Sequence, residues 1–537
     1  MINMKKSIKK KIAMLFCATT IIGSVAGCST AAPSSTVPTA EPAQTAVSEA
    51  NSDTDKPLFS EPVTLSMYTA SHASWPFQKD WYVLDLVNEK TNVSFDINSV
   101  DTEGFTEKLN LIMASGDLPD LIYMMSSAAV QQYGPQGAFV NLLEHMDQMP
   151  NFKKWYDENT AYALSYLSPD GALYMAPQHG VQETNRRIWM YRADVFEKLG
   201  LEVPTNQEEF YDVLVKLKEA YPDSYPLGFR SFTNGLPQLN MIAPSWGTSF
   251  INDDDNIDLG YDYDSKEWVF GPTQDSFREM IAFYHKLYQE ELMIPNFLTI
   301  DTKGWQDVMA NSDSFITLDY LSRIDFFNKS MRESQPVFNM AYMAPPSFGS
   351  EGTAKLAYSS KFVSGFSISS TSKKLDEALA YVDWQYSDEA YELLSWGRPD
   401  ELYTVQADGT RKWNNFKTAA EMKQGTGLQT YGFYSRYNFD GERSTFSPEC
   451  LNASTEAIKY DLPAQPVLSF NEEERAVLET IGMNIRTHCT EQISKFLLGE
   501  RSMDEWDAFV AELEKMGLDD LKRVHESSYA RVLEAMK

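Results

Sequence analysis

An alternation of strand and helix patterns near the start of the folded body is the feature that most constrains this chain. Residues 62–68 alternate apolar and polar side chains with the period of a strand, 93–100 form a second strand candidate, and 121–124 form a short apolar run. Between them, 83–87 and 105–113 have the apolar spacing of helices. Strand, helix, strand, helix and strand in this order predict an α/β domain with a parallel sheet.

The N-terminus has the features of a targeting segment. Five lysines precede an apolar run from Ile12 to Val25, which is too short for a comfortable membrane span. The run ends in Val25-Ala26-Gly27-Cys28, which resembles the lipobox of bacterial lipoproteins, where the cysteine becomes the lipid-modified first residue. We predict a signal peptide over residues 1–27 and lipidation of Cys28. The alternative is an ordinary secretory signal with a chance cysteine.

A tether and a strongly acidic body follow the predicted signal. Residues 28–57 are dominated by Ser, Thr, Ala, Pro and acids, and they cannot bury enough apolar surface to offset their chain entropy, so we predict a disordered tether. The formal charge of the chain is −30, and loss of the five signal lysines makes it about −35 (−30 minus 5). Such a surface repels nucleic acid and anionic lipid, so we expect no nucleic-acid partner and membrane attachment through the lipid alone.

Cysteine and metal patterns leave two questions open. Cys450 and Cys489 remain in the folded body, and in an extracellular protein one disulfide and two buried free thiols are equally good interpretations. The acidic stretch 252–258 fails the complete EF-hand pattern, so we interpret it as a solvated turn, with calcium as the minority alternative. The six histidines show no metal-ligand spacing, and we expect no other cofactor.

Several segments, in their order and spacing, resemble the extracellular solute-binding proteins of carbohydrate ABC importers. The resemblance covers nearly all of the mature body and includes a helix that Thr205 and Glu208 begin as a predicted capping box. It departs from the family pattern at 398–403, where a Gly-rich turn is usual. The segments that carry it are SGDLPD at 115–120, YRAD at 191–194, FYHKLYQEELMIP at 283–295, YVDWQYSDEAYELLSWG at 381–397 and FLLGERSMDEWDAFVAELEKMGLDDL from 496.

The resemblance implies a periplasmic-binding-protein fold of the second type, in which two α/β lobes are joined by a hinge and hold the ligand in the cleft between them. We place the first lobe at 58–182 and 366–432, and the second at 183–365 and 433–537. Because contacts from both lobes exist together only in the closed state, binding favours closure. The resemblance also implies a monomer at the extracellular face of the cell membrane, which delivers a carbohydrate to the permease subunits of an ABC importer and catalyses nothing.

Candidate ligand-binding residues are aromatic and polar side chains in turn-rich segments, because sugars combine apolar ring faces with hydroxyl edges. We expect fewer than half of them to contact ligand. Arg186-Arg187 could neutralise an acidic sugar or form ion pairs, so neutral and anionic ligands both stay open. The candidates are Trp75, Asp120, Arg187, Trp246, Asp319, Tyr320, Trp396, Tyr431, Tyr434 and Arg436.

The best alternative function is a secreted, lipid-anchored enzyme that degrades polysaccharide. Paired carboxylates would be its signature, but with 76 Asp and Glu such a pair can be drawn almost anywhere. The chain has no G-x-S-x-G elbow, no H-E-x-x-H and no P-loop. The sequence therefore favours binding over catalysis, and it does not identify the sugar.

Overall fold

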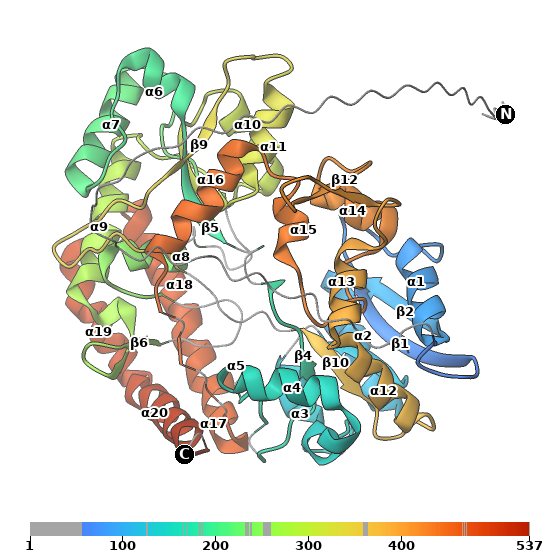
Figure 1. Cartoon of the computed structure of the whole chain (residues 1–537). Helices are drawn as coiled ribbons and strands as arrows, with labels where there is room; N and C mark the ends of the chain where they lie inside the picture. Colours follow the sequence, from blue (N-terminus) through green and yellow to red (C-terminus); the bar gives the residue numbers. More distant parts are fainter. Residues whose placement is uncertain are drawn as a thin grey trace, which may run out of the picture. The chain divides into compact units, whose positions relative to one another are not determined.

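The computed structural model describes residues 56–535 apart from short internal segments (Figure 1). The predicted signal peptide, Cys28, nearly all of the tether and the acidic stretch 252–258 lie outside the described residues. None of the described helices is both long and apolar enough to cross a bilayer. The internal segments that are not described are 125–126, 165, 169, 182–183, 185, 231–235, 237–238, 251–258, 358–363, 464, 467 and 469.

The first sheet has the strand order β2-β1-β3-β10-β4. β1 pairs in parallel with β2, from Val63 opposite Val93 to Ser71 opposite Asp101, and in parallel with β3, whereas β10 is antiparallel to β3 and β4. The parallel strands confirm the α/β prediction. The elements are β1 (Val63–Ser71), α1 (Tyr82–Thr91), β2 (Val93–Asp101), α2 (Phe105–Ser115), β3 (Leu121–Met124), β4 (Ala176–Pro177) and β10 (Gly365–Ile368).

Helices from two distant parts of the chain cover this sheet. Figure 1 shows α12 next to β10, where Leu379 and Val382 of the helix are buried. Together with the strands these helices enclose one group of buried side chains, which we call the first cluster; it draws on residues 59–181 and 366–439. The further elements here are α3 (Ser127–Tyr133), α4 (Pro150–Glu158), α5 (Thr160–Leu164), α12 (Leu375–Gln385), α13 (Asp388–Trp396), β11 (Tyr403–Val405), β12 (Arg411–Trp413), α14 (Ala419–Thr426) and α15 (Phe439–Arg443).

The second sheet has the order β8-β5-β9, with β5 antiparallel to both neighbours. It lies in the second cluster of buried side chains, which draws on residues 188–356 and 446–529. The elements that begin here are β5 (Arg187–Arg192), α6 (Ala193–Leu199), α7 (Gln207–Ala220), α8 (Leu239–Ile242), β6 (Gly260–Asp262), β7 (Glu267–Val269), α9 (Asp275–Gln289), α10 (Thr302–Ala310), β8 (Ile316–Tyr320), α11 (Arg323–Met331) and β9 (Met340–Met343).

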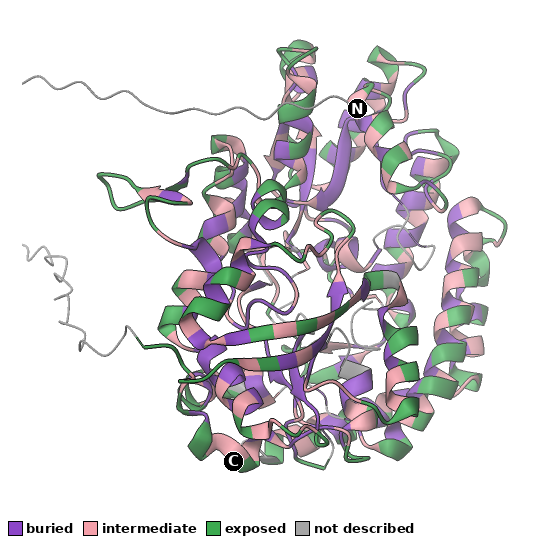
Figure 2. Ribbon diagram, turned by 90° about the vertical axis from the view of Figure 1, so that its right-hand side faces the viewer, coloured by how far each residue is buried: buried purple, intermediate pink, exposed green. Residues whose placement is uncertain are grey.

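The C-terminal helices complete the second cluster. A π-helical turn, Leu478–Gly482, joins α17 (Glu472–Val477) to α18 (Met483–Leu498). Figure 2 shows that helices on the side it presents carry buried residues beside exposed ones, as amphipathic helices packed on a core do. These helices are α16 (Pro448–Glu456), α17 (Glu472–Val477), α18 (Met483–Leu498), α19 (Trp506–Lys515) and α20 (Leu518–Ala535).

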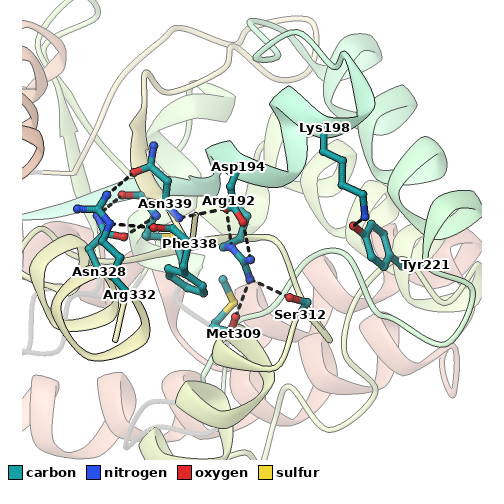
Figure 3. A network of polar contacts seen from close by, with 11 residues as sticks. Arg192, Asp194, Lys198, Tyr221, Met309, Ser312, Asn328, Arg332, Phe338 and Asn339 are labelled. Atoms are coloured by element: carbon teal, nitrogen blue, oxygen red, sulfur yellow. Dashed lines mark hydrogen bonds and ion pairs between the residues drawn. The ribbon is translucent and has the colours of Figure 1, made fainter. Parts of the chain in front are cut away.

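The YRAD segment, residues 191–194, cross-links the end of β5 to two other segments through side-chain contacts (Figure 3). Arg192 donates to both carboxylate oxygens of Asp194 at 2.8 Å and to the Ser312 hydroxyl at 2.9 Å. Its guanidinium carbon lies 3.9 Å from the centroid of the Phe338 ring, and Asp194 accepts from the backbone N–H of Asn339. This network joins the end of β5 to the segments that follow α10 and precede β9.

The start of α7 differs from the prediction by one residue. Asn206, not Thr205, caps the helix, and its side chain accepts from the backbone N–H of Glu209 at 3.0 Å. The Thr205 N–H and hydroxyl each donate to the Glu209 carboxylate at 2.8 Å. The predicted capping box between Thr205 and Glu208 is therefore wrong, because Asn at the next position is an equally strong cap.

No disulfide joins Cys450 and Cys489, and both are buried in the second cluster, so the interpretation as two buried thiols is the correct one. Tyr434 and Tyr437 lie beyond the predicted lobe boundary at 432, yet they pack in the first cluster. The boundaries of the two lobes otherwise stay a prediction.

Two distant segments run side by side at the edge of the first cluster. His179 donates its backbone N–H to Ser435, and Tyr437 donates back to the His179 carbonyl at 2.7 Å. Gly180 has φ +103°, and a Cβ there would lie 2.4 Å from the Tyr437 carbonyl oxygen. Only glycine fits this close approach.

Candidate ligand-binding site

A stacked pair of rings follows the carboxyl end of β1. His72 and Trp75 lie parallel, with ring centroids 3.7 Å apart and 8° between their planes. The backbone closes the turn beneath them, because Trp75 donates to the His72 carbonyl at 3.2 Å and Ser74 donates to His72 Nδ1 at 3.0 Å. Both rings are partly exposed. A local turn thus presents an aromatic surface at the edge of the sheet where open α/β folds place ligands.

Three side chains from the late part of the chain complete what we call the β1-end group: His72, Trp75, Lys423, Tyr431 and Glu442. The Lys423 ammonium lies 4.8 Å from the Trp75 ring centroid and forms an ion pair with Glu442 at 3.5 Å. The Tyr431 ring lies 6.3 Å from that of His72. This group therefore combines aromatic faces with one paired cation.

Burial sets the protonation of this group. Burial and the nearby Lys423 ammonium lower the pKa of His72 below its ordinary 6.5, so the imidazole is neutral at pH 7. Burial, with a contribution from Tyr320, raises the pKa of Tyr431 to about 12, so this phenol keeps its proton. Neutral donors of this kind suit sugar hydroxyls.

A second group lies at the carboxyl end of β8, and we call Arg187, Arg230, Asp319, Tyr320 and Arg323 the β8-end group. Asp319 is fully buried and accepts from Arg230 at 2.6 and 3.2 Å and from Arg323 at 3.3 Å. The Tyr320 backbone N–H donates to the same carboxylate at 2.8 Å. One buried anion thus holds two guanidinium groups and the end of the strand in place.

Two of these cations lie over the Tyr320 ring. Arg187, directly opposite on β5, donates to the Tyr320 hydroxyl at 3.1 Å, and its guanidinium carbon lies 4.7 Å from the ring centroid. The guanidinium carbon of Arg230 lies 5.4 Å from the same centroid. Since the phenol oxygen accepts from Arg187, its own proton is available for another acceptor.

An electrostatic interaction links the phenols of the two groups: Tyr320 adds to the burial that raises the pKa of Tyr431. Of the sequence-predicted residues, the β1-end group contains Trp75 and Tyr431, and the β8-end group contains Arg187, Asp319 and Tyr320.

Asp120 and Trp246 are placed elsewhere. The Asp120 carboxylate accepts from the Ser66 N–H and hydroxyl at 2.8 Å each and from the Ser372 hydroxyl at 2.7 Å, so it ties β1 to the segment after β10. Trp246 is fully buried, and its ring stacks on Phe348 with centroids 5.2 Å apart. Both side chains have structural contacts, and neither joins the two groups.

Trp396, Tyr434 and Arg436 also lie outside the two groups. Trp396 is buried and stacks on Trp413 with centroids 4.7 Å apart. Tyr434 is buried in the first cluster. Arg436 donates to Asp388 at 2.7 Å. Arg186, the neighbour of Arg187, is buried and forms an ion pair with Asp461, which fits the ion-pair interpretation.

Sequence reasoning did not single out His72, Lys423, Glu442 or Arg230. His72 carried a signal, because it stands three residues before Trp75 in the turn after a predicted strand. Lys423 and Glu442 carried no such signal, because all strands from β2 to β12 lie between them and Trp75 in the sequence. No three His, Cys, Asp or Glu side chains gather as a metal site in the described part of the chain.

Comparison with known proteins identifies the family. Residues 76–392, more than half of the chain, match the model of the bacterial extracellular solute-binding proteins. The fructooligosaccharide ABC transporter substrate-binding protein FusA of Streptococcus pneumoniae is 23% identical over 508 residues, which cover 87% of this chain and 90% of FusA. The polygalacturonan/rhamnogalacturonan-binding protein YtcQ of Bacillus subtilis is 21% identical over 456 residues, covering 82% and 87%. Lipoprotein LipO of Bacillus subtilis is 23% identical over 471 residues, covering 83% and 89%.

Solved structures confirm the predicted fold class. The alginate-binding protein AlgQ2 superposes with a TM-score of 0.72 at 23% identity, over 88% of this chain and 99% of AlgQ2. FusA in complex with kestose superposes with a TM-score of 0.70 at 20% identity, over 88% and 100%. A solute-binding role, not catalysis, follows from the family. The chain belongs to the bacterial extracellular solute-binding protein family.

Proposed function

We propose that this protein is the lipid-anchored solute-binding subunit of an ABC importer, which captures an oligosaccharide outside the cell and delivers it to the membrane permease. One observation carries the proposal: a strand of each sheet, β1 and β8, is followed at its carboxyl end by aromatic side chains beside fixed polar groups, His72 and Trp75 at the first and Tyr320 with Arg187 at the second. Aromatic faces beside a few fixed polar groups are what a sugar site requires.

The named ligands of the relatives support a saccharide. FusA is named for fructooligosaccharide and YtcQ for polygalacturonan and rhamnogalacturonan, and both match over more than four fifths of this chain. One ligand is neutral and the other acidic. Arg187 can donate to a hydroxyl or to a carboxylate, so both classes belong in a test.

Capture works by closure of the two predicted lobes. A ligand that touches Trp75, after β1 of the first sheet, and Tyr320, at the end of β8 of the second, gains contacts from both predicted lobes, and these contacts exist together only in the closed arrangement. Binding therefore stabilises the closed state by its differential affinity, and the permease can recognise that state.

A thermal-shift screen with neutral and acidic oligosaccharides tests the proposal. A true ligand at 100 times its Kd stabilises the native state by about 2.7 kcal/mol and raises the Tm. The matched variants are Trp75→Ala, which should reduce the shift, and Trp396→Phe, which should keep it. Product formation from any glycan would favour the secreted enzyme, and a panel that leaves the Tm unchanged would contradict the proposal.

The anchor is tested at Cys28. We expect wild-type cells to incorporate labelled palmitate into the protein and to retain it in the membrane fraction, whereas Cys28→Ser should lose the label and appear in the medium. The name of LipO as a lipoprotein supports this expectation. Membrane retention of the unlabelled variant would refute lipidation as the anchor. Size-exclusion chromatography of the soluble body tests the predicted monomer.

A further inference from the structure

His72 carries a role that stacking alone does not explain. Its ring lies parallel to that of Trp75, and the Tyr431 ring lies 6.3 Å from it. The imidazole is only partly buried. We propose that His72 contacts the ligand directly and that its Nε2–H donates a hydrogen bond to an oxygen of the sugar. This inference rests on the proposed function and names a specificity-determining residue within it.

The hydrogen-bond network selects the tautomer. The backbone N–H of Ser74 points at His72 Nδ1 at 3.0 Å, so Nδ1 must be the acceptor and the proton of the neutral ring is on Nε2. A ring nitrogen that accepts from the chain two residues on mimics the asparagine side chain of an Asx turn. Nδ1 is thus committed to the turn, and Nε2, on the distal edge of the ring, remains to donate.

The surroundings keep this ring neutral. Lys423 on α14 is the charged group that acts on His72, and it is itself paired with Glu442 on α15. Tyr431, from the loop after α14, is a protonated phenol. Within the described residues no carboxylate forms an ion pair with His72. A proton added to Nδ1 would replace the bond from Ser74 with a clash of two donors and would bring a second cation toward Lys423.

Acid should therefore weaken binding through His72. The protonated ring cannot keep both the turn and its position on Trp75, so ligand prefers the neutral form. By linkage, the affinity for a neutral sugar falls as the pH drops through the pKa of His72 in the free protein.

Three substitutions distinguish a direct contact between His72 and the ligand from a purely structural role of this side chain. His72→Asn keeps an oxygen that can accept from Ser74 but lacks the distal donor, His72→Gln places an amide donor near the Nε2 position, and His72→Phe keeps only the ring. We expect His72→Asn and His72→Phe to raise the Kd of the sugar found in the thermal-shift screen about 3- to 10-fold, and His72→Gln to recover most of the loss. The control His145→Gln, in the 3-10 segment Leu142–Gln148, should bind as the wild type. Full affinity in His72→Asn and His72→Phe, or recovery by Asn alone, would overturn the contact.

Nuclear magnetic resonance of the free protein provides a ligand-independent check. The ring nitrogens of His72 should report the Nε2–H tautomer, and the loss of wild-type affinity on acidification should have its midpoint at the pKa measured there. His72→Phe should lack this midpoint. An Nδ1–H tautomer, or the same acid profile in His72→Phe, overturns the inference while leaving the proposed function intact. Failure of the wild type to bind any sugar would instead overturn the proposed function and the contact together.

Discussion

The β1-end and β8-end groups occupy equivalent places, each at the carboxyl end of a strand, but they are held by different forces. Stacking and two backbone bonds shape the turn around His72 and Trp75, and both rings stay partly exposed. Asp319, in contrast, is fully buried and anchors its group through two arginines. One half of the proposed site is therefore built on a partly exposed aromatic surface and the other on a buried ionic frame, so substitution of Trp75 should act mainly on affinity and substitution of Asp319 mainly on stability.

The largest effect is expected from the ionic frame. Asp319→Ala leaves the guanidinium groups of Arg230 and Arg323 without their shared carboxylate in a buried place, so the free energy of unfolding should fall by about 3–5 kcal/mol. Urea denaturation followed by intrinsic fluorescence measures the loss. Asp388→Ala removes an exposed partner of Arg436 and should cost at most about 1 kcal/mol. Equal small losses in both variants would contradict the contrast between the groups.

Acid should act on the second cluster through His525. Burial lowers the pKa of His525 to about 4, so between pH 6.5 and 4 the unfolded chain binds a proton that the folded chain refuses. Stability therefore falls with pH across this window, by about 3 kcal/mol at its lower end. Burial alone would raise the pKa of Asp120, but bonds from Ser372 and Ser66 outweigh it and lower the pKa below 3.8, so the support it gives the first sheet is lost only at more acidic pH.

The variant His525→Phe tests whether His525 causes this loss of stability. The ring packs between Trp268 and Phe470, with centroids 5.4 Å from each, so phenylalanine can take its place without the titration. We expect the slope of unfolding free energy between pH 6.5 and 4 to flatten in this variant and to persist in the control His145→Phe. A slope that survives in His525→Phe would assign the acid sensitivity to other groups.

The aromatic surface should govern affinity. Removing the Trp75 ring takes away a face for a sugar, worth about 1–2 kcal/mol, which corresponds to an increase in Kd of about 5- to 30-fold. Isothermal titration calorimetry measures it. Trp396→Phe alters a buried stack with Trp413 and should lower the Tm while leaving the Kd unchanged. An unchanged Kd after removal of the Trp75 ring, with a raised Kd in Trp396→Phe, would place the ligand outside the β1-end group.

The smallest expected effect is the coupling free energy between the β1-end and β8-end groups. If one ligand lies between Tyr320 and Tyr431, their hydroxyls act together, so the Kd changes of Tyr320→Phe and Tyr431→Phe should not add. A double-mutant cycle should give a coupling of about 0.5–1 kcal/mol. A pair with Tyr437→Phe, whose hydroxyl donates to Glu442, should couple less to Tyr320. Strict additivity for Tyr320 and Tyr431 would separate the two groups.

Local patterns predicted the first sheet well and the site incompletely. The strands at 63–71, 93–101 and 121–124 follow from apolar periodicity that belongs to a few neighbouring residues. Whether an aromatic residue in a turn faces a core or a ligand depends on distant partners: Trp246 has Phe348 against it and Trp75 has Lys423. Nothing near Trp246 or Trp75 in the sequence distinguishes these two surroundings.

Strand β10 has a consequence for the order in which the exported chain assembles. It lies between β3 and β4, yet the part of the second cluster at 188–356 is synthesised before Gly365–Ile368 appears. Until then β3 and β4 keep unpaired edges, which invite pairing with other chains, and closing so long a loop is slow. β5, β8 and β9 all precede β10, so the second sheet can assemble while the first waits. Folding of the first sheet thus ends with the late insertion of one short strand into a sheet begun long before.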